Sequence, residues 1–195
     1  MRAATGAISQ VTVENQRLSC HVLGNAEPQG LCGSGLVDAV AAGLDLEVIE
    51  PSGRFSNGRK EWMLAPPVAL TQSDIRELQL AKGAIAAGFR ILLDRLGAGV
   101  GDLKKLYLAG AFGNYISRTS ARRIGLIDLP IDQVSPAGNT ALLGAKLALF
   151  SAGGEDGSYT SLRRKIEHVA LKSDAKFQEV FVDGLAFPQP SHIQG

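Results

Sequence analysis

The sequence predicts a single compact α/β domain, and three observations lead to that prediction. The chain has 195 residues, of which 45% are hydrophobic and 20% charged, so it holds enough apolar material for one core. Glycine is abundant at 23 residues and aromatic residues make up only 6%, a balance that suits α/β proteins with tight turns. Stretches with strand-like alternation and stretches with helical spacing of apolar residues are joined by glycine-rich turns.

The composition also argues against several classes of protein. A net charge of +1 gives no reason to expect nucleic acid or another polyanion as a partner. The apolar stretches are broken well short of the roughly 20 residues that a membrane-spanning helix needs, so we expect a soluble protein. Cys20 and Cys32 lie far apart and no secretory signal opens the chain, which favours a reducing cytoplasm.

The first segment reads as a β-hairpin. Alternation through Ile8, Val11 and Val13 is followed by the pair Asn15-Gln16 and a second apolar run over residues 18–23. Nothing before it resembles a cap or a strand, so the first residues look like the interior of a longer protein. We therefore expect a fragment of a larger chain whose first strand lies upstream.

A glycine-rich turn over residues 30–35 then leads into a helix that begins near Ser34, with apolar residues at helical spacing up to Leu44. The amino end of such a helix offers free backbone N–H groups and the positive end of a dipole. Gly33, Ser34 and Gly35 are therefore candidates for a phosphate-binding turn. Residues 46–67 follow no regular pattern and are expected to form a loop or a short ribbon.

The clearest element is a long helix over residues 72–96. Thr71 followed by Asp74 resembles a capping box, an apolar stripe from Ile75 to Leu96 marks one face, and Gly97 ends the pattern. This stripe is predicted to face the core.

A strand over residues 105–109 runs directly into the glycine loop 110–115, an arrangement that often binds ligands in α/β sheets. A short helix over 117–124 follows. Val134 then leads through Gly138 and Asn139 into a helix over residues 141–150, which is apolar enough to be predicted as mostly buried.

Two units are expected along the chain. Residues 1–150 form the main lobe, and residues 151–195 form an extension packed on the same domain. Within that extension the pattern predicts a loop over 151–158, an amphipathic helix over 162–171 and an apolar strand over 180–187.

The glycine turns carry the main functional signal, because glycine lets the backbone approach a nucleotide and a following helix start favours an anion. None of them has the spacing of a P-loop or of a dinucleotide fingerprint, and a tight turn forced by packing explains any single one equally well. Phosphoryl transfer needs charge-neutralising groups, and no carboxylate stands out, since a helix face accounts for Asp38 and a cap for Asp74.

For the other potentially reactive side chains, a structural role or no role is the simpler interpretation. Cys32 is more simply a small buried thiol than a reactive one at a helix start. The three histidines are scattered and suggest neither a metal site nor a triad. The arginines of the 117–124 helix are more simply a solvated face than a phosphate site. The three histidines are His21, His168 and His192, and the arginines are Arg118, Arg122 and Arg123.

Three motifs in this order resemble a known family. They are residues 30–38 (GLCGSGLVD), residues 70–85 (LTQSDIRELQLAKGAI) and residues 108–116 (LAGAFGNYI). Together they look like the reductive activators of corrinoid-dependent methyltransferases, and the resemblance runs over residues 1–187.

The resemblance implies an RNase H-like lobe of the acetate and sugar kinase, heat-shock chaperone and actin superfamily, in which two lobes clasp ATP. The chain looks like most of the second lobe, with a mixed sheet flanked by helices. On that reading the strand 106–109 precedes the adenosine loop, and residues 136–140 resemble the second connecting motif. The nucleotide-binding residues that this implies are Gly110, Ala111, Phe112, Gly113, Asn114, Gly138 and Asn139.

The resemblance also implies an activity for the parent protein. An electron passes from a 2Fe-2S cluster to an inactive Co(II) corrinoid protein of a methyltransferase system, and hydrolysis of ATP with Mg²⁺ drives this step to Co(I). The ferredoxin-like domain and the two phosphate motifs lie outside this chain, whose two cysteines fall short of the four thiolates of a cluster. The chain alone is therefore expected to be inactive, and a homodimer is left open.

Two alternatives remain at this stage. A small-molecule kinase of the same superfamily would share the adenosine loop and would yield a phosphorylated product. A non-catalytic module that docks a corrinoid protein would keep the fold without binding ATP. Fold likeness alone does not choose between them, because function belongs to the site.

Overall fold

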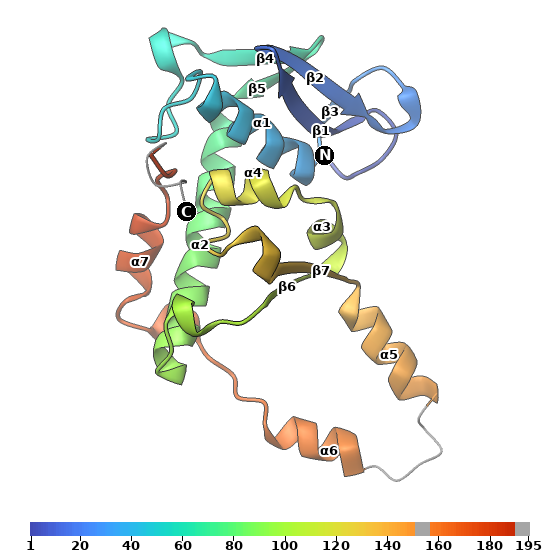
Figure 1. Ribbon diagram of the computed structural model, residues 1–195, viewed down its shortest axis with the longest axis vertical. Helices are drawn as coiled ribbons and strands as arrows, with labels where there is room; N and C mark the ends of the chain where they lie inside the picture. Colours follow the sequence, from blue (N-terminus) through green and yellow to red (C-terminus); the bar gives the residue numbers. More distant parts are fainter. Residues whose placement is uncertain (151–156, 190–195) are drawn as a thin grey trace.

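The computed structural model describes residues 1–150 and 157–189. Three small sheets and a set of helices make up this part of the chain, with the long helix α2 (Gln72–Leu96) running through the body (Figure 1). One of the sheets is mixed and helices flank the sheets, as the fold class requires, but the strands do not join into one sheet within the described residues.

The first sheet has the order β2-β1-β3 and contains the predicted hairpin. Strand β1 (Ala7–Glu14) pairs antiparallel with β2 (Arg17–Val22) and parallel with β3 (Gly30–Leu31). Asn15 and Gln16 both have positive φ angles, 50° and 63°, as a tight two-residue hairpin turn requires. The hairpin prediction is confirmed.

Helix α1 (Gly33–Asp45) packs against β1 and is buried over most of its length. A Cβ atom added at Gly35 would lie 2.1 Å from the carbonyl oxygen of Ile8, so only glycine allows the helix to approach the strand this closely. Val37 and Val40, both fully buried, then fill the space between α1 and the sheet.

The region predicted as a loop or ribbon contains a second hairpin. Strand β4 (Glu61–Ala65) pairs antiparallel with β5 (Val68–Thr71), which leads directly into α2. The capping box at that junction is confirmed, because Asp74 Oδ2 accepts from Thr71 N–H at 2.8 Å and Thr71 Oγ1 accepts from Asp74 N–H at 3.3 Å. Gly97, with φ of 65°, ends the helix.

The third sheet holds two parallel strands, β6 (Leu106–Ala109) and β7 (Val134–Gly138). Helices α3 (Gly110–Tyr115) and α4 (Arg118–Arg123) connect them, and α5 (Thr140–Phe150) follows β7. Short 3-10 helices complete the connections of the described chain at Leu23–Asn25, Ser56–Gly58, Val100–Asp102, Ile131–Gln133 and Leu171–Ser173.

Helix α5 contradicts its prediction, because none of its residues is buried. Leu142, Leu143 and Leu147 are all more than half exposed, and Phe150 is 84% exposed. In Figure 1 α5 and α6 (Gly157–Arg164) project from the body. Helix α5 is apolar, as the sequence indicates, but the described residues do not supply a surface that covers it.

The C-terminal extension also differs from its prediction. The amphipathic helix expected over residues 162–171 is wrong, since α6 ends at Arg164 and most of the segment is irregular. Residues 180–187 are not a strand, because helix α7 (Phe177–Asp183) occupies the first half of them and the second half is irregular. The β-favouring run Val180-Phe181-Val182 suggested a strand, whereas Phe177 and Phe181, four residues apart and stacked, have helical spacing.

Helix α7 packs closely on α2 at two glycines. A Cβ atom added at Gly83 would lie 2.8 Å from Phe181 O, and one added at Gly184 would lie 3.1 Å from the Cα of Gly83. After α7 the chain passes back over α2, where Phe187 is buried in the core and its N–H donates to Pro51 O at 2.9 Å. The segment after α7 is thereby fixed to the first half of the domain at Phe187.

Replacing Gly83 with alanine should lower the free energy of unfolding by about 1–3 kcal/mol, because the added methyl group would lie 2.8 Å from the backbone oxygen of Phe181 and 2.9 Å from the Leu185 side chain. Gly144→Ala is the matched control, since Gly144 also lies in a helix and nothing lies within 4 Å of an added Cβ. That control should be neutral or stabilising by up to ~1 kcal/mol. Urea unfolding measures both, and equal effects of the two substitutions would contradict the close α2–α7 contact.

Candidate functional site

The parallel pairing of β6 with β7 brings the two predicted nucleotide segments together. Ala109, the last residue of β6, pairs with Gly138, the last residue of β7. The segment predicted as a glycine loop folds instead as the short helix α3. The start of α3 at Gly110 and the turn at Gly138-Asn139 therefore leave the same edge of the sheet. Ligands of α/β proteins are commonly bound at the carboxyl ends of parallel strands.

The two glycines of this segment, Gly110 and Gly113, are glycine for different structural reasons. Gly113 is required by packing, because an added Cβ would lie 2.7 Å from Leu108 O. Gly110 has φ of 89°, which side chains rarely allow, yet nothing lies within 4 Å of an added Cβ. Gly110 thus presents its backbone to open space, and Gly113 lets α3 fold back on the strand.

The remaining predicted residues of this site are only partly described. The side chains of Ala111, Phe112 and Asn114 lie outside what the structure describes. Gly138 has φ of 69°. Asn139 caps α5, since its Oδ1 accepts from Leu142 N–H at 3.0 Å. A role of these residues in nucleotide binding stays a prediction.

Unlike Gly110, the turn Gly33-Ser34-Gly35 does not face open space. Ser34 is buried, and its hydroxyl donates to Ser9 O at 2.8 Å. Cys32 is buried beside it, with Sγ 3.3 Å from Ser34 Oγ, so it has the buried position predicted for it. Packing on β1 explains these residues, and a phosphate role for them stays a prediction.

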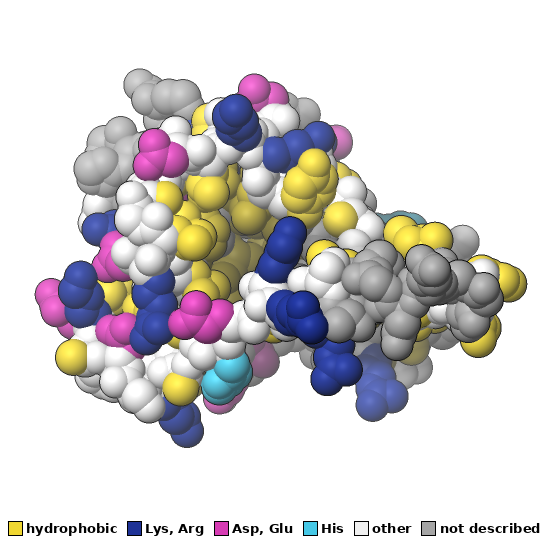
Figure 2. All heavy atoms as spheres, turned by 90° about the horizontal axis from the view of Figure 1, so that it is seen from below, with side chains coloured by type: hydrophobic (Ala, Val, Ile, Leu, Met, Phe, Trp, Pro, Cys, Tyr) yellow, Lys and Arg dark blue, Asp and Glu magenta, His cyan; other side chains and the backbone are white. Residues whose placement is uncertain are grey.

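A groove of about 1220 Å³ opens beside β6, and Ala109 and Gly113 are among its lining residues. Its other walls come from α2, from the segment 125–129 and from α7 with the chain after it. Figure 2 shows the hollow, with an apolar floor and charged side chains around the rim. The candidate loop therefore borders a large apolar space.

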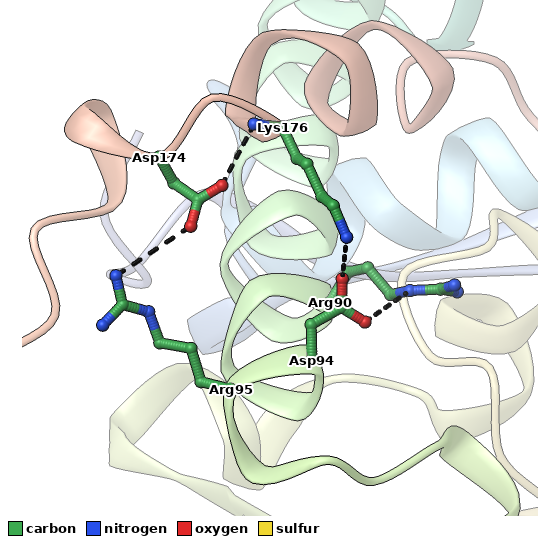
Figure 3. A network of polar contacts seen from close by, with 5 residues as sticks. All are labelled: Arg90, Asp94, Arg95, Asp174 and Lys176. Atoms are coloured by element: carbon green, nitrogen blue, oxygen red, sulfur yellow. Dashed lines mark hydrogen bonds and ion pairs between the residues drawn. The ribbon is translucent and has the colours of Figure 1, made fainter.

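An ionic network holds one rim of this groove (Figure 3). Asp94 on α2 contacts Arg90 at 3.3 Å and Lys176 at 3.1 Å, and Arg95 lies 4.0 Å from Asp174. The hydrogen bond from Lys176 lowers the pKa of the Asp94 carboxyl, and the charges of Lys176 and Arg90 add to this effect. The network ties the start of α7 to the end of α2.

Two buried polar side chains of α2 bond to backbone carbonyl groups near the groove, and one of them, Lys82, lines it. Gln79 Nε2 donates to Ser52 O and Leu185 O, both at 3.1 Å, and Lys82 Nζ donates to Ala186 O at 2.8 Å. Both residues are 4% exposed. The predicted core stripe from Ile75 to Leu96 did not include these two residues. The stripe also faces the core only in part, since Ile75 and Leu78 are buried whereas Ile85, Leu92 and Leu96 are exposed.

Two further groups were interpreted incorrectly from the sequence. Arg123 does not lie on a solvated face, because it is 9% exposed and pairs with Asp45 of α1. Asp38 is buried at the contact of α1 with β1, where its Oδ2 accepts from Val11 N–H at 3.3 Å and its Oδ1 has no hydrogen-bond partner among the described residues. Burial raises the pKa of Asp38, against hydrogen bonds from Ser120 and Val11.

Arg118 donates to Val134 O at 3.0 Å and so joins α4 to β7. Arg122 lines the groove. Among the described residues, which include His21 and His168, no group of three or more His, Cys, Asp or Glu side chains could hold a metal ion, and His192 lies outside the described residues.

Comparison with known proteins decides the family. Residues 1–193 match the family model described as the C-terminal domain of RACo, the ASKHA domain. The chain belongs to this family. A solved reductive activator for a corrinoid, iron-sulfur protein has the same fold, with a TM-score of 0.84 and 29% identity over 97% of this chain and 33% of that one.

Two curated relatives of the ASKHA domain agree with this assignment. The corrinoid activation enzyme RamQ of Eubacterium limosum is 33% identical over 217 residues, which cover 96% of this chain and 36% of RamQ. The [Co(II) methylated amine-specific corrinoid protein] reductase of Methanosarcina barkeri is 28% identical over 162 residues, which cover 83% of this chain and 30% of that protein. The chain spans about a third of the length of its relatives. In its described part no helix combines the length and apolar character needed to cross a membrane.

The buried Lys82 provides a test of the contacts around the groove. Burial lowers the pKa of Lys82 from 10.5 to about 8, so between these values the unfolded chain binds more protons than the folded chain. The free energy of unfolding should therefore rise with pH from about 8 to 10.5, by a few kcal/mol at ~1.4 kcal/mol per pKa unit.

Lys82→Met should remove this rise, whereas Lys60→Met, at an exposed position, should keep it. Urea unfolding at a series of pH values measures the slope. A slope that is unchanged in Lys82→Met would contradict the burial of this ammonium group.

Proposed function

We propose that this chain is the nucleotide-binding C-terminal part of an ATP-dependent reductive activator, which returns an inactive Co(II) corrinoid protein to Co(I). One observation carries the proposal. In a member of the ASKHA family, the register of β6 with β7 sets Gly110 beside the Gly138-Asn139 turn, and Ala109 and Gly113, close to Gly110 in sequence, line a large groove. The names of the relatives supply the reaction.

The nucleotide role rests on backbone geometry. Gly110 offers an open stretch of backbone in which an aromatic base can approach the chain closely, and Gly113 fixes the direction in which the chain leaves β6. The left-handed conformation of Gly138 turns the chain into α5, and Asn139 caps that helix. These residues would contact and orient the nucleoside, while the groups that bind the phosphates and Mg²⁺ would come from the other part of the protein.

The redox chemistry belongs elsewhere in the full-length protein. A 2Fe-2S cluster needs four ligands, and the two cysteines of this chain are a half-exposed Cys20 on β2 and a buried Cys32. Reduction of the substrate Co(II) to Co(I) takes one electron, which leaves the donor cluster oxidised by one electron. Hydrolysis of ATP would supply the free energy for this uphill transfer.

The substitution Gly110→Ala tests the assignment in the full-length protein. The added methyl group should weaken ATP binding by about tenfold or more, equivalent to ~1.4 kcal/mol, and should slow ATP-dependent formation of Co(I). Gly58→Ala is the control, because Gly58 also has a positive φ and empty space around an added Cβ but belongs to the 3-10 helix Ser56–Gly58 and not to the ends of β6 and β7. Calorimetric titration with ATP and Mg²⁺ and the Co(I) absorption spectrum provide the two measurements.

Three other outcomes would contradict the proposal. Unchanged ATP affinity in a folded Gly110→Ala protein would remove this loop from the nucleotide site. A phosphorylated small molecule in place of Co(I) would indicate a kinase. Absence of ATP binding in the unmodified full-length protein would indicate a docking module.

A further inference from the structure

Helix α4 lies on the chain between β6 and β7, the two strands whose ends form the candidate nucleotide edge. In Figure 1 it is placed between α1 and this pair of strands. Its first residue, Arg118, donates to Val134 O at 3.0 Å and so fastens α4 to the start of β7. Ala121, in the middle of α4, is fully buried. A shift of α4 would therefore be passed to β7 and to the turn at Gly138.

The last residue of α4, Arg123, is 9% exposed, and its guanidinium has two partners. Nε donates to the carboxylate of Asp45 on α1, and Nη1 donates to Pro188 O at 3.4 Å. A buried arginine is costly unless its charge is paired and its donors are bonded. Arg123 therefore ties α4 both to α1 and to the segment after α7.

Asp45 stands where a helix normally disfavours a carboxylate. It is the last residue of α1, whose last turn holds no basic residue, and the negative end of the helix dipole repels a carboxylate there. The side chain is 58% exposed, so packing does not require an acidic residue at this position either. The bond to Arg123 is therefore the contact that accounts for Asp45.

We infer that Arg123, paired with Asp45, is a positioning residue of the nucleotide site. This inference rests on the proposed function and adds to it a residue outside the two turns. The partners of Arg123 lie on α1 and after α7, so it acts through α4, whose place on α1 fixes β7 against β6. Binding at Gly110 and Gly138 needs both turns held in one geometry, and a site that must be rearranged before it binds loses affinity.

Substitutions of the pair in the full-length protein test this role. Asp45→Ala and Arg123→Met should each weaken ATP binding by about tenfold, and the double variant should bind no more weakly than the weaker single one, because both remove one contact. Arg123→Lys keeps a positive charge beside Asp45 and should lose about threefold or less. At saturating ATP every variant should form Co(I) at the unmodified rate, since the groups that transfer the electron are unchanged.

Asp74→Ala is the control for a general loss of stability. It removes the capping box at the start of α2, which has no contact with α4 in its hydrogen bonds. This variant should therefore unfold at a lower urea concentration and bind ATP as the unmodified protein does. Calorimetric titration with ATP and Mg²⁺ measures the affinities, and the Co(I) absorption spectrum measures the rates.

Unchanged ATP affinity in Asp45→Ala overturns the positioning role, and this half-exposed position decides the question even where Arg123→Met does not fold. An equal loss of affinity in Asp74→Ala also overturns it, because affinity would then follow stability alone. So do additive losses in the double variant, which indicate two separate contacts. Absence of ATP binding in the unmodified full-length protein overturns the proposed function as well, so the two failures are told apart by the unmodified protein.

Discussion

The parallel register that sets Ala109 beside Gly138 determines where the candidate binding residues of this domain lie. The two turns are separated in sequence by α3, α4 and a loop, and each is an ordinary glycine turn when taken by itself. Because parallel strands end at the same edge of a sheet, pairing alone brings both turns to one place. The contacts of Arg118 with Val134 O and of Arg123 with Asp45 hold the intervening helix α4 against β7 and α1.

Elsewhere in the domain, elements are held together by close approach of one backbone to another. Gly35 lets α1 contact β1, and Gly83 lets α7 contact α2. Gln79 and Lys82 then bond to carbonyl groups after α7, so the segment after α7 is held against α2. The groove lies beside β6, which pairs with β7 on one edge and has no second strand partner among the described residues. The binding edge and the uncovered edge are thus two properties of one small sheet.

Features with local causes could be predicted from the sequence. The β1–β2 hairpin depends on two turn residues, and the start of α2 depends on Thr71 and Asp74, all within a few positions of each other. The β6 strand follows from an apolar run, whereas the segment after it, predicted as a glycine loop, folds as the short helix α3. The resemblance of three motifs to a family of corrinoid activators was confirmed by the family model and by the relatives.

Features that depend on distant residues could not be predicted in this way. Gly110 and Gly113 look alike in the sequence, but only the position of Leu108 O distinguishes the open one from the packed one. Arg123 is buried because α1 brings Asp45 to it. The exposure of α5 was missed because an apolar helix is normally buried, and here the described residues do not provide the covering surface.

Titration of this chain and of the full-length protein with ATP and Mg²⁺, side by side in a calorimeter, tests the central claim most directly. The claim is that the edge at Gly110 and Gly138 is one half of a nucleotide site, completed by the rest of the polypeptide. It predicts clear binding to the full-length protein and binding to this chain that is absent or weaker by at least about a hundredfold, ~2.7 kcal/mol. Equal affinity in the two proteins would contradict a shared site, and binding to neither would contradict a nucleotide site.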